Sequence, residues 1–198
     1  IPIAAVASVS VQATHRRRGI NRNMMRLQLE DIYSRNEPLA VLQASESIIY
    51  GRYGYGMSSF EDSLSIMKEH GAYAQEYRPS GRLYFCDEDE ARTIFPDIYQ
   101  SAIQNRVGTT VREDNWWQFR FLEPGLKGGD PRSWFVRHVE SGINTGYVRY
   151  TINGRVLHIL ELVSSTFEGY SALWRFCLDM DLVDTIEAAH RPVDEELR

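Results

Sequence analysis

Hydrophobic and polar positions divide the first part of the chain into a strand, a helix and a second strand. Small and β-branched residues dominate Ala5–Gln12, which predicts a strand followed by a basic turn. From Ile20 to Ser34 apolar residues recur every three or four positions, as on one broad face of a helix. Pro38 ends that helix, and the apolar run Leu39–Leu42 is too short for another. We therefore expect a β-loop-α-β unit with parallel strands.

The middle of the chain contains turn signals and a change of pattern. Glu46–Tyr50 predicts a short helix before a stretch rich in glycine and tyrosine, and Ser58–Met67 predicts a further strand. The stretch Gly71–Gly81 has no apolar periodicity, which is typical of a crossing between domains. We therefore expect two domains, residues 1–78 and residues 79–198.

The second half predicts an antiparallel sheet with helices. Leu83–Phe85 reads as a strand, and Asp87 with Glu90 has the spacing of a capping box that starts a helix, which Pro96 would bend or divide. Asn153-Gly154 is a strong hairpin signal between two strands. The other expected elements are the strands Trp134–Val139, Gly146–Ile152, Arg155–Val163 and Asp184–Ala189, and the helix Phe167–Leu178.

The last elements repeat the order of the first: strand, turn, helix, strand. At the turn, Ser164-Ser165-Thr166 stands where the first unit has arginines and a glycine. We infer a second copy of the unit without phosphate chemistry. The predicted fold class is α/β (α+β), with mixed sheets flanked by helices.

Composition and charge limit the function. The 198 residues are 43% hydrophobic with a net charge of -5, which excludes a disordered tail and a generally basic surface. No apolar stretch reaches the roughly 20 residues of a membrane span and no signal peptide is recognisable, so we expect a cytoplasmic protein. Cys86 and Cys177 are too few for a disulfide scaffold and read as inert core residues, and the five histidines lack metal-ligand spacing. Because the chain opens at Ile1 in a strand pattern, we expect a segment of a longer protein, with the first unit incomplete at its N-terminus.

The turn before the first helix carries the clearest chemistry. Helix N-termini present unpaired N–H groups and a partial positive charge, and Gly19 would let a phosphate approach the backbone. Arg16, Arg17 and Arg18 add guanidinium donors suited to phosphate oxygens. The turn is neither a Walker loop nor a dinucleotide fingerprint. The plainer alternative is a solvated basic turn.

This segment resembles the acetyl-CoA loop of the GNAT acetyltransferase superfamily, which reads arginine or glutamine, two residues, glycine, one residue, then glycine or alanine. Arg16-Arg17-Arg18-Gly19-Ile20-Asn21 supplies that pattern, except that Asn21 replaces the small final residue. Further on, Ile49-Tyr50-Gly51-Arg52-Tyr53-Gly54-Tyr55-Gly56 resembles the segment that holds the superfamily's tyrosine. The resemblance makes Tyr50 the acid that protonates the departing thiolate, which a phenol protonated at neutral pH can do. On their own, Tyr50, Tyr53 and Tyr55 would read as core aromatics.

Both motifs together are similar to the Eis (enhanced intracellular survival) family of actinobacterial acetyltransferases. Trp116-Trp117 and His190-Arg191-Pro192-Val193-Asp194 look like features of that family's second, non-catalytic GNAT-like domain. The resemblance implies that acetyl-CoA is the co-substrate, with a pantetheine arm held by Val9 and Val11. It also implies further contacts to the cofactor, from Arg16, Arg17, Gly19, Ile20, Asn21 and Ser45.

The resemblance also implies hexamer formation and the transfer of acetyl groups to aminoglycoside or lysine side-chain amines. Family members are longer, and the missing parts complete the amine pocket, so the sequence assigns no general base. Glu46 lies near Tyr50, but a carboxylate beside a helix start is more often a cap or a surface group.

Three hypotheses follow. The leading one is an acetyl-CoA-dependent N-acetyltransferase in which a neutral amine attacks the thioester directly. The alternative is a catalytically silent CoA-binding or regulatory module. The third, nucleic-acid binding through Arg16–Arg18, is disfavoured by the net charge of -5 and by the single short basic turn.

Overall fold

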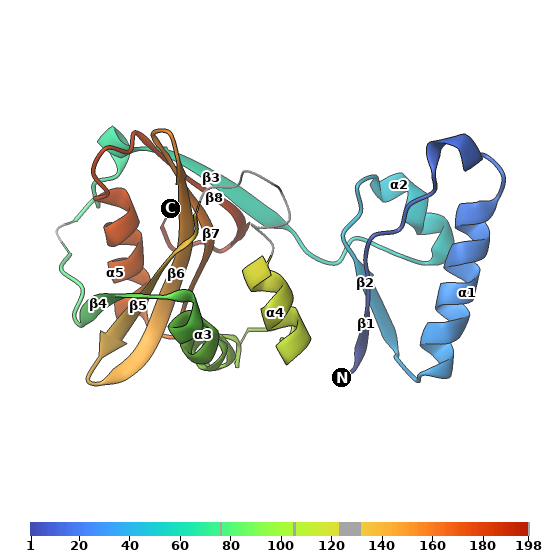
Figure 1. Ribbon diagram of the computed structural model, residues 1–198, viewed down its shortest axis with the longest axis horizontal. Coiled ribbons are helices and arrows are strands. Elements are labelled where there is room, and N and C mark those ends of the chain that lie inside the picture. Colours follow the sequence, from blue (N-terminus) through green and yellow to red (C-terminus); the bar gives the residue numbers. More distant parts are fainter. Residues whose placement is uncertain (76, 105, 123–131, 198) are drawn as a thin grey trace. The chain divides into compact units, whose positions relative to one another are not determined.

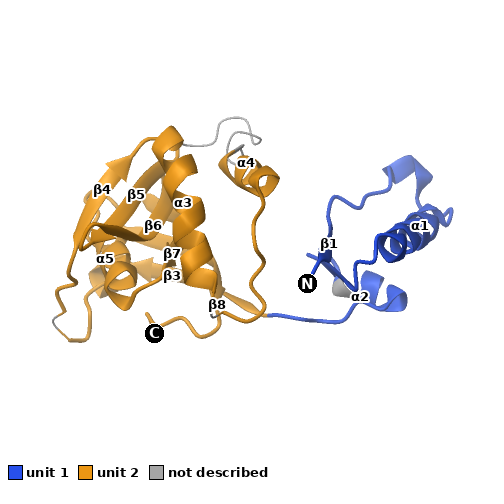
Figure 2. Cartoon of the chain, turned by 90° about the horizontal axis from the view of Figure 1, so that it is seen from below, with its two compact units in different colours: residues 1–59 blue, residues 60–198 orange. Residues whose placement is uncertain are grey.

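The computed structural model describes residues 1–75, 77–104, 106–122 and 132–197. Contacts divide the chain into two compact units, residues 1–59 and residues 60–198, which Figure 2 shows in separate colours. Among the described residues, no helix combines the length and apolar character that a bilayer crossing requires.

The first unit is a β-loop-α-β arrangement, as the hydrophobic pattern predicted (Figure 1). Its strands pair in parallel, and Ala4 and Val6 of the first strand form a small core with Ile32 of the helix. Its elements are β1 (Ile3–Val6), the 3-10 helix η1 (Ala13–His15), α1 (Ile20–Ser34), β2 (Leu39–Leu42), α2 (Ser47–Tyr50) and the 3-10 helix η2 (Gly51–Tyr53).

The first strand is shorter than the expected Ala5–Gln12. Ser8 has a φ of 57°, in the left-handed region, which is incompatible with regular extended pairing. Pairing with β2 therefore stops at Val6, although Val9 still packs against the small core. The backbone between Val6 and η1 is left outside the sheet.

The second unit is built on one mixed sheet of six strands. All neighbouring strands are antiparallel except β7 and β8, which are parallel. The strands, in spatial order, are β3 (Glu61–Met67), β8 (Thr185–Pro192), β7 (Val156–Ser164), β6 (Ile143–Asn153), β5 (Trp134–Glu140) and β4 (Arg82–Cys86).

Helices cover both faces of this sheet (Figure 1). The helices are α3 (Glu88–Ile103), α4 (Asp114–Leu122), α5 (Phe167–Leu178) and the short 3-10 helix η3 (Lys68–His70). Val148 of β6 belongs to the core shared with α5, whereas its neighbour Tyr147 belongs to the core shared with α3 and α4. Because successive strand residues point to opposite faces, β6 is buried on both sides.

Most of the second half follows the sequence prediction. The predicted strands and the helix Phe167–Leu178 are present, and Asp87 with Glu90 forms the expected capping box. The helix α3 is not divided: it runs through Pro96 as one element, with Phe95 and Ile98 buried in the core. Packing on both sides of the proline offsets the backbone hydrogen bond that Pro96 cannot make.

The division between the units lies earlier than the crossing predicted at Gly71–Gly81. The strand β3 pairs with β8 from Glu61↔Pro192 to Met67↔Thr185. Residues 61–67 therefore belong to the second sheet, and the two units divide between Ser59 and Phe60 rather than after residue 78.

Candidate functional site

The carboxyl ends of β1 and β2 define the candidate site in the first unit. The last paired residues are Val6 and Leu42, and beyond them the two segments no longer pair with each other. Both η1 and α2 lie at this end of the strand pair (Figure 1). In open α/β arrangements, ligands bind outside the carboxyl ends of the strands, next to the N-termini of the following helices.

The loop into α1 has an irregular backbone that exposes amide groups. Arg17 has a φ of 61° and Gly19 a φ of 78°, so two of the three residues before α1 adopt the left-handed conformation. The first intrahelical bond runs from the Asn23 N–H to the Gly19 carbonyl at 3.1 Å. The N–H groups of Ile20 and Asn21 therefore have no acceptor within the helix, and no side chain of the described residues caps α1.

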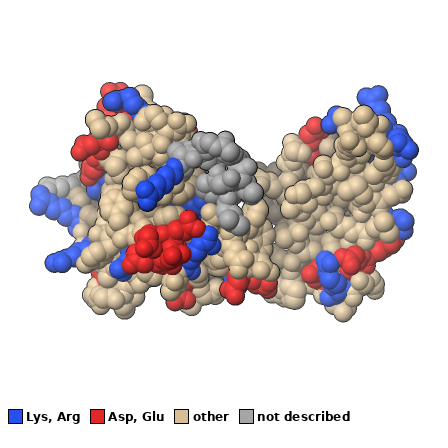
Figure 3. All heavy atoms as spheres, viewed as in Figure 1, with Lys and Arg blue, Asp and Glu red and all other residues tan. Residues whose placement is uncertain are grey.

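The basic side chains of this turn are exposed. Arg16, Arg17 and Arg18 are all open to solvent, and Figure 3 shows basic atoms gathered at this end of the first unit. Free amides, a helix dipole and three guanidinium groups together fit the charge and hydrogen-bonding needs of a pyrophosphate. The residues present therefore suit the phosphate part of acetyl-CoA.

The other expected cofactor contacts lie at the same end. Val9 and Val11 are half-buried in the segment between β1 and η1, and no backbone–backbone hydrogen bond among the described residues involves either. Ser45 is exposed and follows the last paired residue of β2. The polypeptide backbone at Val9 and Val11 is therefore available to a ligand, as contacts to a pantetheine arm would require.

Tyr50 ends the short helix α2 and lies beside a second phenol. Its ring meets that of Tyr55 edge to face, with 6.1 Å between the ring centroids. The pKa of Tyr55 is raised, mainly by burial and to a smaller extent by the negative charge that Tyr50 can carry. Glu46 precedes α2 but is exposed, and its side chain does not cap the helix.

The corresponding helix start in the second unit is closed by its own side chains. The hydroxyl of Thr166 accepts the Gly169 N–H at 3.1 Å and caps α5. Ser164 accepts the Thr166 N–H and donates to the Thr145 carbonyl at 2.9 Å. A Cβ added to Gly169 would lie 2.6 Å from the Ser164 oxygen, so α5 packs closely against Ser164 at this turn. The absence of phosphate chemistry in the second copy stays a prediction.

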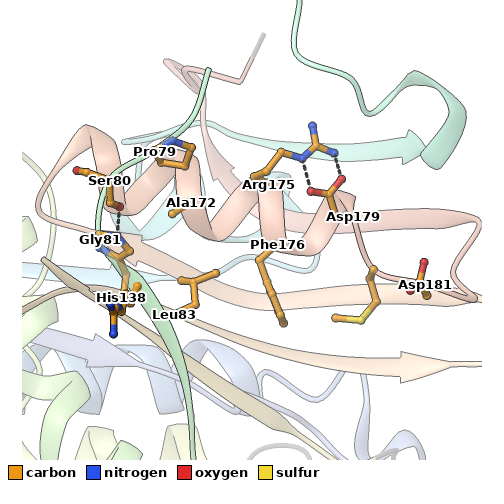
Figure 4. Close-up of a pocket in the computed structure, with 12 residues that line it drawn as sticks. Pro79, Ser80, Gly81, Leu83, His138, Ala172, Arg175, Phe176, Asp179 and Asp181 are labelled. Carbon is orange, nitrogen blue, oxygen red and sulfur yellow. Dashed lines mark hydrogen bonds and ion pairs between the residues drawn. The ribbon is translucent and has the colours of Figure 1, made fainter. Parts of the chain in front are cut away.

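A cavity of about 460 Å³ lies between β4 and α5 in the second unit (Figure 4). His138 lines it but is fully buried, with one ring nitrogen 2.6 Å from the Thr145 hydroxyl and the other 2.8 Å from the Ser80 carbonyl. Arg175 is paired with Asp179 at 2.8 Å. His138 and Arg175 are thus engaged in structural contacts, and the described residues contain no cluster of three metal-ligating side chains.

A larger cavity of about 1070 Å³ lies over β7 and β8 and contains a buried charge cluster that the sequence did not reveal. Glu161 of β7 accepts hydrogen bonds from Arg112 at 2.6 and 3.2 Å and from the Tyr147 hydroxyl at 2.8 Å. Burial opposes ionisation, but the Arg112 and Arg120 guanidinium groups outweigh it and lower the pKa of Glu161. A single acidic residue within a largely apolar strand is the sequence signal for this cluster.

Comparison with known proteins agrees with this fold. Two protein-family models, both described as an acetyltransferase (GNAT) domain, match residues 1–58 and 108–198. An uncharacterized N-acetyltransferase from Streptomyces avermitilis is 34% identical over 98% of this chain and 50% of its own length. The N-acetyltransferase Eis of Mycobacterium tuberculosis is 29% identical over 98% of this chain and 49% of its own length.

A solved structure gives the same result. The crystal structure of Eis1 from Mycobacterium abscessus matches with a TM-score of 0.78 at 31% identity, covering 100% of this chain and 50% of that one. The chain thus spans about half the length of the curated relatives it matches. Residues 1–58 and 108–198 are therefore segments of acetyltransferase (GNAT) domains, and the homologues of the chain are N-acetyltransferases that include Eis.

Proposed function

We propose that this chain is part of an acetyl-CoA-dependent N-acetyltransferase and that the first unit holds the cofactor. The observation that carries the proposal is the uncapped start of α1, with left-handed backbone at Arg17 and Gly19, at the open ends of two parallel strands. Such a turn is suited to a diphosphate group. The filled and capped start of α5 supplies the contrast within the same chain.

Each residue of the site has one task in this proposal. The backbone of Val9 and Val11 holds the pantetheine arm, and Ser45 lines the same channel. The side chains of Arg16 and Arg17 bind phosphate oxygens, together with the amides of Gly19, Ile20 and Asn21. When bound, acetyl-CoA supplies the acetyl group in activated form as a thioester.

Tyr50 is the proposed general acid. A neutral amine attacks the acetyl carbon directly, the carbon–sulfur bond breaks, and the Tyr50 hydroxyl gives its proton to the sulfur. The amine nitrogen loses a proton to solvent, and the described residues supply no base that we assign to this step. Holding the two reactants in place contributes most of the rate.

The finer properties follow from the resemblance to the Eis family. We propose aminoglycoside amines and lysine side-chain amines as acceptors, which would make the protein a factor in antibiotic resistance. We further propose a cytoplasmic hexamer that does not bind nucleic acid and does not span a membrane.

The test measures thiol release from acetyl-CoA by the full-length protein with an aminoglycoside or a lysine peptide as acceptor. We expect Tyr50→Phe to lower kcat about a hundredfold. We expect Arg17→Ala to weaken acetyl-CoA binding about tenfold by calorimetry, because it removes a charge-assisted hydrogen bond. Arg26→Ala, which removes an exposed arginine paired with Glu30 on α1, is the matched control and should leave binding unchanged. Equal effects of the two arginine variants would contradict the assignment of the phosphate site.

The alternative is a catalytically silent module that binds CoA. The observation in its favour is that the chain already contains one unit, around α5, whose phosphate turn is filled. Saturable binding of acetyl-CoA by the full-length protein, with no acetylation of any amine offered, would support this alternative.

A further inference from the structure

The hydroxyl of Tyr55 is buried and has no hydrogen-bond partner in the described part of the chain. Among the described side chains of residues 1–59, it is the only buried polar atom without a hydrogen bond. A buried donor of this kind is disfavoured and is expected to have a function or a partner that arrives later. Tyr55 otherwise reads as a packing aromatic, and nothing in its sequence position indicated this hydroxyl.

The backbone holds Tyr55 next to Tyr50. The N–H of Tyr55 donates to the Tyr50 carbonyl at 3.4 Å, which closes the η2 turn between them. Gly54, with a φ of 89°, provides the left-handed residue that reverses the chain. The two rings then meet at 75° with their centroids 6.1 Å apart. The pair is thus set by local geometry and does not depend on a distant contact.

The surroundings of Tyr55 favour its protonated state. Burial raises its pKa, and negative charge on Tyr50 raises that pKa further. When Tyr50 has lost its proton, Tyr55 therefore keeps its own and remains a hydrogen-bond donor. A neutral donor beside a new phenolate lowers the energy of the charged form.

We propose that Tyr55 is a positioning residue for Tyr50, donating a hydrogen bond to the Tyr50 oxygen once that oxygen has given up its proton. This inference rests on the proposed role of Tyr50 as general acid. In the step, the Tyr50 O–H bond breaks and an S–H bond forms on the departing thiolate. The Tyr55 O–H bond stays intact throughout, and the Tyr50 phenolate then takes a proton from water.

The kinetic test uses full-length Tyr55→Phe, Tyr50→Phe and the double variant, with Tyr53→Phe as the matched control from the same turn. We expect Tyr55→Phe to lower kcat about tenfold and to leave the KM for acetyl-CoA unchanged. In the Tyr50→Phe background, removing the second hydroxyl has no further effect, because Tyr55 acts through Tyr50.

A second measurement does not depend on turnover. With tyrosine labelled at the ring carbon that bears the hydroxyl, the Tyr55 signal is assigned by its loss in Tyr55→Phe and then titrated. In Tyr50→Phe the ring and its packing remain but the charge is gone, so we expect the pKa of Tyr55 to fall toward its ordinary value. An unchanged Tyr55 titration would overturn the coupling even if no acetyl transfer were detected.

The outcomes separate this inference from the proposed function. An active wild type, a slow Tyr50→Phe and a Tyr55→Phe with wild-type kcat would refute the positioning role and leave the acetyltransferase intact. A Tyr55→Phe effect on KM alone would instead assign the hydroxyl to cofactor binding. If Tyr53→Phe were as slow as Tyr55→Phe, the loss would be general disturbance of the turn, which also contradicts the proposal.

Discussion

The buried carboxylate of Glu161 permits a quantitative test of how the second unit is held together. Its side chain is 13% exposed and that of Arg112 is 17% exposed, so the pair is largely removed from water. Arg112 lies before α4 and Arg120 lies on it, while Tyr147 comes from β6. The carboxylate thus connects the central strands to the helix that the sequence did not predict.

Replacing Glu161 with Gln keeps the volume and removes the charge. The amide still accepts from Tyr147, but the buried guanidinium of Arg112 loses its counter-charge. Removing one member of a buried ion pair typically costs about 3 to 5 kcal/mol, because the other charge stays buried. Because the hydrogen bond from Tyr147 is retained, we expect Glu161→Gln to lower the free energy of unfolding by about 3 kcal/mol.

The pH dependence gives a second signature. The pKa of Glu161 is lowered in the folded state, so its stabilising effect is complete above the unfolded value of about 4.3 and is lost as pH falls through the lower folded value. Glutamine does not titrate. The difference in unfolding free energy between wild type and Glu161→Gln should therefore be largest near neutral pH and shrink below about pH 4.

Urea unfolding of the full-length protein, followed by tryptophan fluorescence and by hydrogen exchange in β7, measures this difference. The control is Glu88→Gln, which breaks the exposed pair with Arg92 on α3 and should change stability by less than about 0.5 kcal/mol. A loss equal to that of the control, or a difference that stays constant down to pH 3, would refute the reasoning.

Three further substitutions probe the two helix starts and one tight turn. Thr166→Ala removes the α5 cap and should cost about 1 kcal/mol of stability without changing acetyl-CoA affinity, as measured by urea unfolding and calorimetry. Gly81→Ala should cost about 3 kcal/mol or more, because φ is +84° and a Cβ would lie 2.3 Å from a ring nitrogen of His138. Gly19→Ala meets no atom within 4 Å, so its φ of +78° should cost only about 1 kcal/mol, whereas acetyl-CoA binding should weaken about tenfold. Unchanged acetyl-CoA affinity in Gly19→Ala, or a loss of that affinity in Thr166→Ala, would contradict this comparison.

Helices and strands with a regular pattern could be predicted, because the spacing of apolar residues along their buried face is visible in the sequence. The helix Phe167–Leu178 has apolar residues at helical spacing with Thr166 before it, and the observed bounds agree with the prediction. The helix α4 has no such pattern, since Trp116 and Phe119 are exposed while Trp117 and Phe121 are buried. Its position depends on aromatic partners such as Tyr99, whose ring meets that of Trp117 edge to face at 5.5 Å. Such partners are not adjacent in the sequence.

The candidate site could be predicted from the sequence in part. Turn residues act locally, so the arginines, Gly19 and the helix start at Ile20 could be located from the sequence, and the structure has α1 begin there. The division between the units could not, because β3 belongs to the second sheet through its pairing with β8, about 120 residues away along the chain. The sequence also could not indicate that the Tyr55 hydroxyl is buried without a partner among the described residues, because the burial of one atom depends on tertiary packing.

The two copies of the strand–turn–helix–strand unit differ in how the N–H groups at the helix start are satisfied. Both have parallel strands on either side of a helix, so both helix starts carry the same partial charge. At α5 the Ser164 and Thr166 hydroxyls already accept the N–H groups of Thr166 and Gly169. At α1 the residue before the helix is Gly19, which has no side chain to do this, and the amides remain open. In our proposal, the difference between the phosphate-binding turn at α1 and the structural turn at α5 is whether the chain supplies its own acceptor oxygens at the helix start.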